Sequence, residues 1–224
     1  MFITEVNIAA GSDESFVDIF AALWWADFVG SFFEAGGNAV YYFHYIPLGQ
    51  SFGCHDTSPG TFSMFTTTKD YELQQPTSQY FAGKLITQEW VQAGDGEHKV
   101  FRSVSDIQDG AGHTLVTSYA VLRPDGQWSL MLVNKDQLNA QPVHIVFENE
   151  AGTSQFTGQL SIITFGSEQY QWRSDVKDGV ADPDGPEARS SLPAPGNATF
   201  TLPKSSVTVI RGKLGEFAPH PRKT

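Results

Sequence analysis

The sequence predicts an α/β part in residues 1–92 and an all-β part in residues 93–214. In the first part, two short apolar segments flank a longer apolar segment, which is the pattern of a strand–helix–strand unit. In the second part, short segments rich in β-branched and aromatic residues alternate with turn signals. The chain has 224 residues, of which 40% are hydrophobic, so it is long enough to bury a large core.

The first strand is expected at residues 1–7. It is a short apolar segment that runs into Glu5, followed two residues later by Asn7. In parallel α/β barrels, the ends of strands of this kind carry the chemistry. Glu5 is therefore the first candidate functional residue.

The helix that follows is expected to run to about Glu34. Ser12 or Asp13 can cap it, because either side chain can accept a hydrogen bond from the free N–H groups of the first turn. Gly36 and Gly37 should terminate it, since glycine adopts the left-handed conformation without a steric cost.

The second strand is expected at residues 39–45, a nearly continuous apolar and aromatic run. Such a run is typical of a strand that is covered on both faces, as in a parallel sheet. A right-handed crossover should join it to the first strand. Alternation along the strand places Tyr42 and His44 on one face and Tyr45 on the other. Which of the two faces points inward is left open.

Residues 47–75 should form a long loop, and another helix should follow at residues 76–90. Cys54, His55 and Asp56 stand together in this loop and raise the question of a metal site or a reactive thiol. Adjacent side chains point in different directions, and no partner cluster lies nearby in the sequence. We therefore predict neither a metal site nor a catalytic thiol, and no cofactor.

Seven short strands are predicted in the all-β part. They are residues 100–104, 114–122, 128–134, 143–147, 160–165, 198–202 and 206–211. Seven strands with turn signals between them indicate an antiparallel β-sandwich. Four prolines in residues 178–196 indicate a long loop, and residues 215–224 are expected to form a flexible tail.

Composition excludes some classes of partner. There are 25 acidic and 14 basic residues, a net charge of −11, and no basic stripe, so nucleic acid is not an expected partner. Asp18 and Asp27 interrupt the apolar stretch that follows residue 16, so a buried helix is favoured over a membrane span. The single cysteine excludes an intrachain disulfide. No signal peptide is visible, and secretion or a periplasmic location would require one upstream of Met1.

Five features of the sequence together carry a resemblance to a known group of enzymes. They are Ile3-Thr4-Glu5 with Asn7, the helix end at Gly36-Gly37, the aromatic run 41–45, the helix start Pro76-Thr77-Ser78, and the segment at residues 200–209. In this order and spacing, the chain resembles the C-terminal portion of a retaining glycoside hydrolase of the (β/α)8-barrel superclan, which includes xylosidases, iduronidases and endoglucanases. The resemblance implies a partial (β/α)8 barrel, formed by its last two βα units, followed by an antiparallel β-sandwich.

The resemblance also implies a chemistry. Glu5 matches the nucleophile of a double displacement on β-linked saccharides, while Asn7, Tyr42, His44 and Tyr45 would border the sugar. The second carboxylate, which acts as acid and base, would follow an earlier strand, and no segment of this chain matches it. The expected partners are therefore a carbohydrate substrate and either the missing N-terminal portion of the barrel or a second copy of the chain.

Simpler interpretations stand beside this one. Glu5 could be the polar end of a strand, Asn7 could stabilise a turn, and the aromatic residues could pack in a barrel. Two rival functions follow: a non-catalytic carbohydrate-binding or accessory module, and an inactive gene fragment. Because two barrel units leave apolar faces uncovered, we expect exposed hydrophobic surface around residues 1–45.

Overall fold

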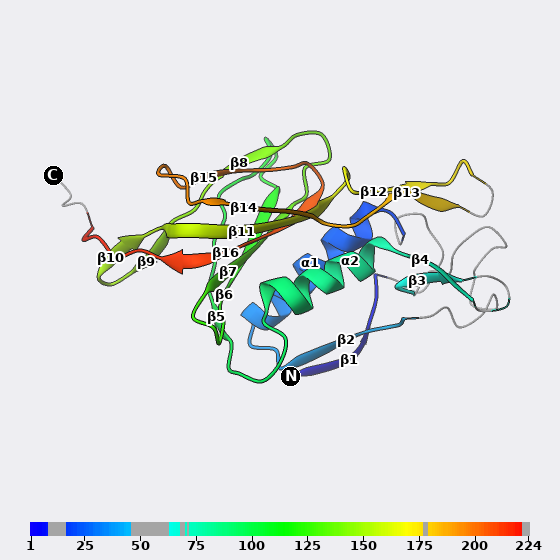
Figure 1. Ribbon diagram of the computed structural model, residues 1–224, viewed down its shortest axis with the longest axis horizontal. Helices are drawn as coiled ribbons and strands as arrows, with labels where there is room; N and C mark the ends of the chain where they lie inside the picture. The colour runs from blue at the N-terminus through cyan, green and yellow to red at the C-terminus, as the bar shows by residue number, and fades with distance from the viewer. Residues whose placement is uncertain (9–16, 46–62, 68–69, 71, 177–178, 221–224) are drawn as a thin grey trace.

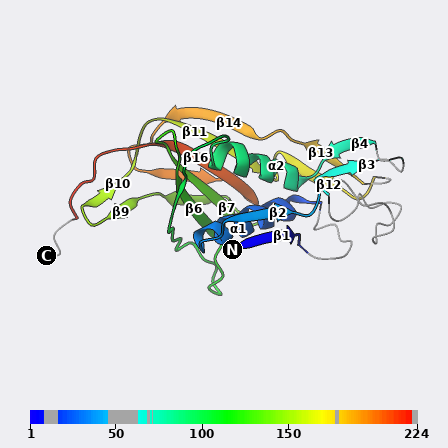
Figure 2. The ribbon, with the colours of Figure 1, turned by 90° about the horizontal axis from the view of Figure 1, so that it is seen from below.

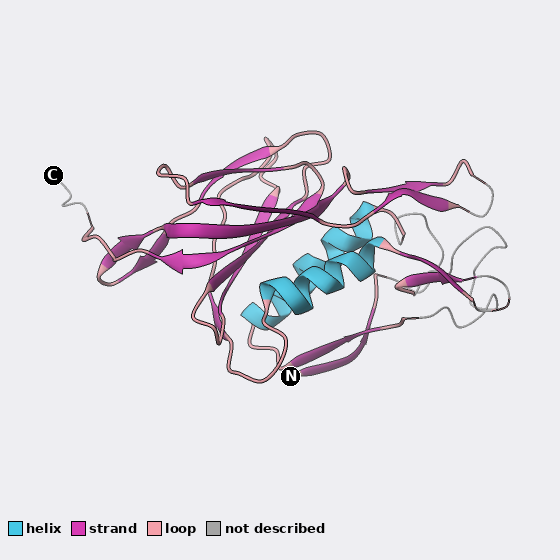
Figure 3. Cartoon of the chain, in the orientation of Figure 1, coloured by secondary structure: helices cyan, strands magenta, loops and turns pink. Residues whose placement is uncertain are grey.

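The computed structural model describes residues 1–8, 17–45, 63–67, 70, 72–176 and 179–220, in which strands predominate over helices (Figure 3). The elements lie in layers (Figures 1 and 2). A pair of parallel strands, β1 and β2, lies on one side of two packed helices, α1 and α2. A large antiparallel sheet lies on the other side of these helices.

The predicted strand–helix–strand unit is confirmed. β1 (Phe2–Val6) and β2 (Ala39–Tyr42) form a parallel pair, and α1 (Ile19–Glu34) connects them. The backbone N–H of Asn38 donates to the carbonyl of Met1 at 2.9 Å, which joins the start of β2 to the start of β1.

The second strand is less covered than its sequence predicts. Within the predicted second strand, Tyr41 is 59% exposed and Tyr45 63%, so the expectation of burial on both faces was wrong. Phe2 of the neighbouring β1 is 70% exposed. The physical reason is that β1 and β2 pair only with each other among the described residues, and the helices cover one face of the pair. The expected exposed hydrophobic surface around residues 1–45 is confirmed.

Helix α1 begins at Ile19, where the side chain of Asp18 caps it by accepting from the backbone N–H of Phe20 at 2.8 Å. The predicted caps at Ser12 and Asp13 lie outside the described residues. The helix ends as expected, with Gly36 in the left-handed region at a φ of 83°.

The second helical segment follows a hairpin that the sequence analysis placed within a loop. β3 (Phe65–Thr67) and β4 (Leu73–Pro76) pair antiparallel, and α2 (Ser78–Lys84) continues directly into a π-helical turn, η2 (Leu85–Trp90). The indole Nε1 of Trp90, at the end of η2, donates to the carbonyl of Tyr119 at 3.0 Å. This bond attaches the end of the helical segment to the large sheet.

The large sheet has six antiparallel strands in the order β14-β11-β16-β7-β6-β5. In chain order they are β5 (Lys99–Phe101), β6 (Val116–Leu122), β7 (Trp128–Asn134), β11 (Phe156–Gly166), β14 (Ala188–Pro193) and β16 (Ser206–Leu214). Each of the seven predicted strands overlaps an observed strand.

Short strand pairs surround the six-stranded sheet. β8 (Gln141–His144) pairs with β15 (Thr199–Leu202), β9 (Phe147–Asn149) with β10 (Gly152–Ser154), and β12 (Tyr170–Arg173) with β13 (Val180–Asp184). Ala218 forms a bridge to Thr153, so the described end of the chain lies against the β9–β10 hairpin.

The predicted loop over residues 178–196 was wrong, because this segment contains β13 and β14. Its prolines obscured the strands in the sequence. Pro193 is the last residue of β14, and β14 is an edge strand of the sheet. Proline is tolerated at such a position because the lost N–H is not needed by a further neighbour.

The six-stranded sheet is covered on both faces. Along β7, Met131 and Val133 belong to the core shared with α1 and α2, whereas Leu130 and Leu132 belong to a second core beneath β8 and β15. Side chains alternate between the two faces of a strand, so both sets are buried only if both faces are covered. This explains why β7 is buried along almost its whole length.

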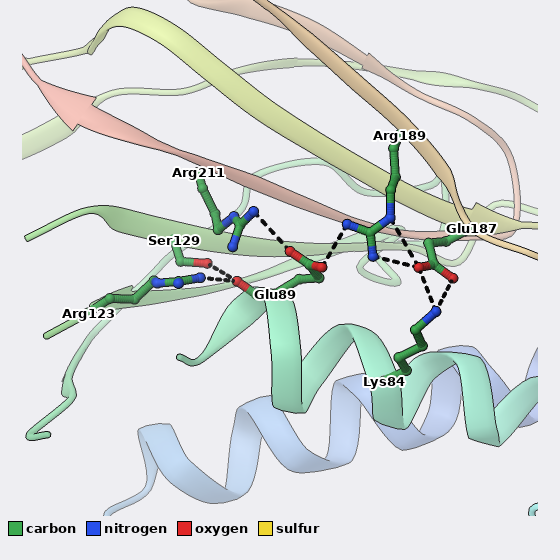
Figure 4. Close-up of polar contacts among 7 residues, drawn as sticks. All are labelled: Lys84, Glu89, Arg123, Ser129, Glu187, Arg189 and Arg211. Atoms are coloured by element: carbon green, nitrogen blue, oxygen red, sulfur yellow. Dashed lines mark hydrogen bonds and ion pairs between the residues drawn. The ribbon is translucent and has the colours of Figure 1, made fainter. Parts of the chain in front are cut away.

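A chain of ion pairs built on two buried carboxylates, Glu89 and Glu187, attaches the helical segment to the large sheet (Figure 4). The carboxylate of Glu89, in η2, lies 2.8 Å from Arg189 and 2.9 Å from Arg211. Arg189 also pairs with Glu187 at 2.6 Å, and Glu187 pairs with Lys84 at 2.9 Å. Oppositely charged groups therefore alternate along the boundary between helix and sheet.

Backbone contacts reinforce this chain of ion pairs. The carbonyl of Glu89 accepts hydrogen bonds from the Arg123 guanidinium at 2.7 Å and from the Ser129 hydroxyl at 3.3 Å (Figure 4). Both donors come from the sheet side of the boundary. Glu89 thus joins η2 to the sheet through its side chain and its main chain.

Replacing Glu89 with alanine should lower the free energy of unfolding by about 1–3 kcal/mol, because the mostly buried Arg211 loses its carboxylate partner, whereas the exposed Arg189 keeps its pair with Glu187. Denaturant titration of the variant would measure this. Glu168→Ala, which removes an exposed carboxylate, is the matched control and should change the free energy by less than about 0.5 kcal/mol. A loss of less than about 1 kcal/mol for Glu89→Ala would show that the ion pairs contribute little.

Stability should also depend on pH through Glu187. Burial raises the pKa of Glu187, but hydrogen bonds from Arg189 and Lys84 outweigh it, so the pKa lies below its ordinary value of 4.5. A lowered folded-state pKa means that the stabilisation is present above the unfolded-state pKa and is lost as pH falls through the folded-state pKa. Between about pH 5 and pH 3, wild type should therefore lose more unfolding free energy than Glu187→Gln. Equal losses in denaturant titrations would contradict this.

Candidate functional site

The candidate site lies at the C-terminal end of the β1–β2 pair. The register between the two strands shifts there: Ile3 lies opposite Val40, and Val6 lies opposite Tyr42. β1 therefore has one more residue than β2 between these two pairs, and Glu5 belongs to the irregular stretch. Such bulges redirect side chains and are over-represented next to active sites.

Glu5 itself is exposed to solvent. Within the described residues, its carboxylate has no ion-pair or hydrogen-bond partner. An exposed carboxylate without a partner is available to a ligand, but its position alone assigns no chemistry.

Asn7 joins the ends of the two strands. Its Nδ2 donates to the carbonyl of Phe43 at 2.6 Å and to the phenol of Tyr42 at 3.3 Å, and its Oδ1 accepts from the backbone N–H of Ile8 at 2.7 Å. The backbone N–H of Phe43 donates to the carbonyl of Val6 at 2.9 Å. Both ends of the amide are engaged, so Asn7 fastens the end of β2 to the segment that leaves β1.

Tyr42 is half-buried beneath this contact. Its ring packs edge-on against Trp25 of α1, with a centroid distance of 5.0 Å. Burial raises the pKa of the Tyr42 phenol above its ordinary value, although hydrogen bonds from Asn7 and Gln79 act in the opposite direction. The phenol therefore stays protonated at neutral pH.

His44 and Tyr45 follow directly after β2. The ring of His44 lies edge-on to Phe43, with a centroid distance of 4.4 Å, and its carbonyl accepts from the backbone N–H of Met64 at 3.2 Å. Tyr45 lies on the surface. The structure thus brings Asn7 and Tyr42 into direct contact and places Glu5 in the same strand-end region, with Tyr45 exposed nearby in the sequence.

The described residues contain no group of three or more His, Cys, Asp or Glu side chains that could hold a metal ion. Cys54, His55 and Asp56 lie outside the described residues. No helix among those described has the length and apolar character needed to cross a bilayer.

A polar centre around Asp27 was not expected from the sequence. The carboxylate of Asp27 accepts hydrogen bonds from the hydroxyl groups of Thr117 and Tyr119, and Lys135 lies 3.4 Å from it. Burial and the adjacent Asp27 carboxylate raise the pKa of Tyr119 to about 12. The available signal was a carboxylate within an apolar helix, which needs a polar partner.

No protein-family model and no curated protein sequence matches this chain. Several solved protein structures do match this chain. The catalytic domain of GH30 xylanase C from Talaromyces cellulolyticus is 13% identical with a TM-score of 0.55, and the match covers 95% of this chain and 40% of that one. The GH51 α-L-arabinofuranosidase from Thermotoga petrophila is 12% identical with a TM-score of 0.53, covering 88% and 38%.

CelM2, a bifunctional glucanase-xylanase from a metagenome library, is 17% identical with a TM-score of 0.50, and the match covers 96% of this chain and 31% of that one. The chain therefore has the fold of part of these glycoside hydrolases. It spans between 31% and 40% of the length of these three structures. The resemblance found in the sequence is confirmed at the level of the fold.

Replacing Asn7 with alanine should destabilise the chain by about 1–3 kcal/mol, because the carbonyl of Phe43 loses its side-chain donor in a half-buried position. Denaturant titration measures the loss, and hydrogen exchange at the Ile8 amide should accelerate. Thr4→Ala, an exposed position on the same strand, is the control. Unchanged stability in Asn7→Ala would show that Asn7 does not have this structural role.

Proposed function

We propose that this chain is the C-terminal portion of a retaining glycoside hydrolase, with Glu5 as its nucleophile. The observation that carries the proposal is the position of Glu5 at the bulged C-terminal end of a parallel strand, in a chain with the fold of part of several glycoside hydrolases. Asn7, Tyr42, His44 and Tyr45 would border the sugar.

In this proposal, β1 with α1 and β2 with α2 are the last two βα units of a (β/α)8 barrel. Two features support this assignment: the parallel pairing of β1 with β2, and the contacts between α1 and α2. The six-stranded sheet with the β8–β15 pair would be the C-terminal β-sandwich, since the two are joined by a common apolar core.

The reaction would proceed by double displacement. The Glu5 carboxylate attacks the anomeric carbon, the glycosidic C–O bond breaks, and a second acid protonates the departing oxygen. Water then attacks the glycosyl-enzyme, releasing the sugar and regenerating the carboxylate. Asn7 would hold Tyr42 in place so that its protonated phenol donates a hydrogen bond near the sugar.

The second carboxylate would come from a preceding part of the barrel. In retaining enzymes the two carboxyl groups lie roughly 5–5.5 Å apart, and no segment of this chain matches the second one. The exposed apolar side chains of Phe2 and Tyr41 are consistent with further barrel strands beside β1 and β2. This portion of the barrel is the proposed protein partner.

The proposed substrate class is a β-linked glycoside of a plant-type polysaccharide. The similar structures are those of a xylanase, a bifunctional glucanase-xylanase and an α-L-arabinofuranosidase, and these activities belong to those proteins. A second candidate function is a non-catalytic carbohydrate-binding module. Among the described residues, Glu5 is the one candidate carboxylate at the strand end, which supports this alternative.

A covalent trap tests the proposal. The native polypeptide, isolated from its source with an antibody to residues 93–214, is incubated with 2-deoxy-2-fluoro xyloside and glucoside inactivators that carry good leaving groups. We expect the label on Glu5, located by peptide mass spectrometry. Glu5→Gln should lower hydrolysis by about 10⁴-fold or more while keeping the fold, because the covalent step is lost.

Glu168→Gln, which neutralises an exposed carboxylate elsewhere, is the matched control and should retain full activity. Retained hydrolysis in Glu5→Gln, or a label on another carboxylate, would overturn the assignment. A polypeptide that binds saccharide without hydrolysing it would favour the binding module.

A further inference from the structure

A polar cleft lies between the C-terminal end of α1 and the start of the all-β part. It has a volume of about 480 Å³, within the range of roughly 300–1,000 Å³ that is usual for small-molecule sites. Side-chain hydroxyl groups line it: Ser31, Ser103, Ser105, Thr114, Thr117, Ser118 and Tyr119. Two charged residues, Glu34 and Arg102, and two apolar residues, Ala35 and Val116, complete its lining.

The walls of the cleft are held together by hydrogen bonds. The Oε1 atom of Glu34 accepts from the backbone N–H of Ser103 at 2.8 Å, which ties the helix to the strand-side loop. The hydroxyl of Ser31 lies 2.8 Å from that of Tyr119, and the hydroxyl groups of Ser103 and Ser118 are also hydrogen-bonded. Four of the hydroxyl groups, those of Ser31, Ser103, Ser118 and Tyr119, are therefore held in position before any ligand arrives.

Some polar groups of this cleft have hydrogen-bonding sites that no described residue occupies. Within the part of the chain that the structure describes, the Arg102 guanidinium has no ion-pair or hydrogen-bond partner, and the Oε2 atom of Glu34 accepts no hydrogen bond. A hydroxyl group has one donor and two acceptor sites, so the single bond between Ser103 and Ser118 leaves further sites on both, whereas the Tyr119 hydroxyl is already engaged by Ser31 and Asp27. The cleft therefore offers donors and acceptors side by side.

This combination of hydroxyl groups with one carboxylate and one guanidinium favours some classes of ligand over others. A phosphate or other compact anion is disfavoured by Glu34 and by Asp27 directly behind Tyr119. A metal ion is disfavoured because the described residues hold no cluster of metal-ligating side chains. An apolar ligand would leave the Arg102 guanidinium and the Oε2 atom of Glu34 without a partner. A neutral polyhydroxylated ligand can satisfy both, since each of its hydroxyl groups both donates and accepts.

The cleft is separate from the end of β1 that carries Glu5. Helix α1 runs back across the strand pair, so Glu34 at its C-terminus lies near the start of β1, where Asn38 bonds to Met1, whereas Glu5 lies toward the opposite end. A helix of 16 residues spans about 24 Å at 1.5 Å per residue. A ligand in the cleft therefore does not occupy the proposed catalytic end.

We propose that this cleft is an auxiliary saccharide-binding site, in which Arg102 donates to and Glu34 accepts from neighbouring hydroxyl groups of one neutral sugar unit. The lining hydroxyl groups hold the adjoining part of the same short oligosaccharide. The site binds without catalysis. It keeps the chain attached to a polysaccharide while the proposed catalytic end acts elsewhere.

The test is a titration of the full chain with xylohexaose and, separately, with cellohexaose. Binding is measured by calorimetry and by NMR of the backbone amides. Binding of at least one of them should shift amide signals of Ser31, Ser103 and Thr114. Arg102→Ala should weaken that binding by about tenfold or more, because a charge-assisted donor is lost. Arg173→Ala, which removes an exposed arginine paired with Asp175, is the matched control and should leave the affinity unchanged.

Glu5→Gln separates this inference from the proposed catalytic role. Oligosaccharide binding in the cleft should survive this substitution, whereas hydrolysis by the native polypeptide should not. The inference is overturned if neither oligosaccharide binds, if the shifted amides lie at the end of β1 instead, or if Arg102→Ala leaves the affinity unchanged. None of these outcomes tests the proposed role of Glu5, which is tested by the covalent labelling experiment.

Discussion

Tyr119 is the point at which the helices and the large sheet are joined. The close approach of α1 requires a glycine there, because a Cβ on Gly30 would lie 2.3 Å from the Tyr119 ring. The Tyr119 hydroxyl bonds to Asp27 and Ser31 on α1, and its carbonyl accepts from Trp90 at the end of η2. One strand residue thus holds both helical segments, and the side chains around it form the largest shared core.

This junction determines where the candidate sites lie. Because α1 is fixed on the sheet, the β1–β2 pair on its other side is positioned by the same helix, through contacts such as that between Trp25 and Tyr42. The N-terminal end of α1 therefore lies toward the strand end with Glu5, and its C-terminal end borders the polar cleft. A single rigid element separates the proposed catalysis from the proposed binding.

The boundary between helix and sheet is held by two different kinds of interaction. Apolar packing around Tyr119 joins side chains of the helices and the sheet, and the ion pairs of the buried Glu89 carboxylate join η2 to Arg189 and Arg211 of the sheet. By contrast, the outer face of the β1–β2 pair has neither, and Phe2 and Tyr41 are exposed there. The similar glycoside hydrolase structures are longer than this chain, which covers between 31% and 40% of them.

Local sequence patterns were sufficient to predict several elements. The helix end at Gly36, the parallel strand–helix–strand unit and all seven predicted strands depend on the order of neighbouring residues, which is why periodicity and turn chemistry revealed them. The exposed apolar surface also followed from two strands having too few neighbours. Only the tertiary structure decided that β2 is half-covered and that the proline-rich segment contains β13 and β14. It also decided that Asp27 meets Thr117 across 90 positions of sequence. Those features depend on contacts between segments that are distant in the sequence, and local sequence patterns do not predict which segments will be in contact.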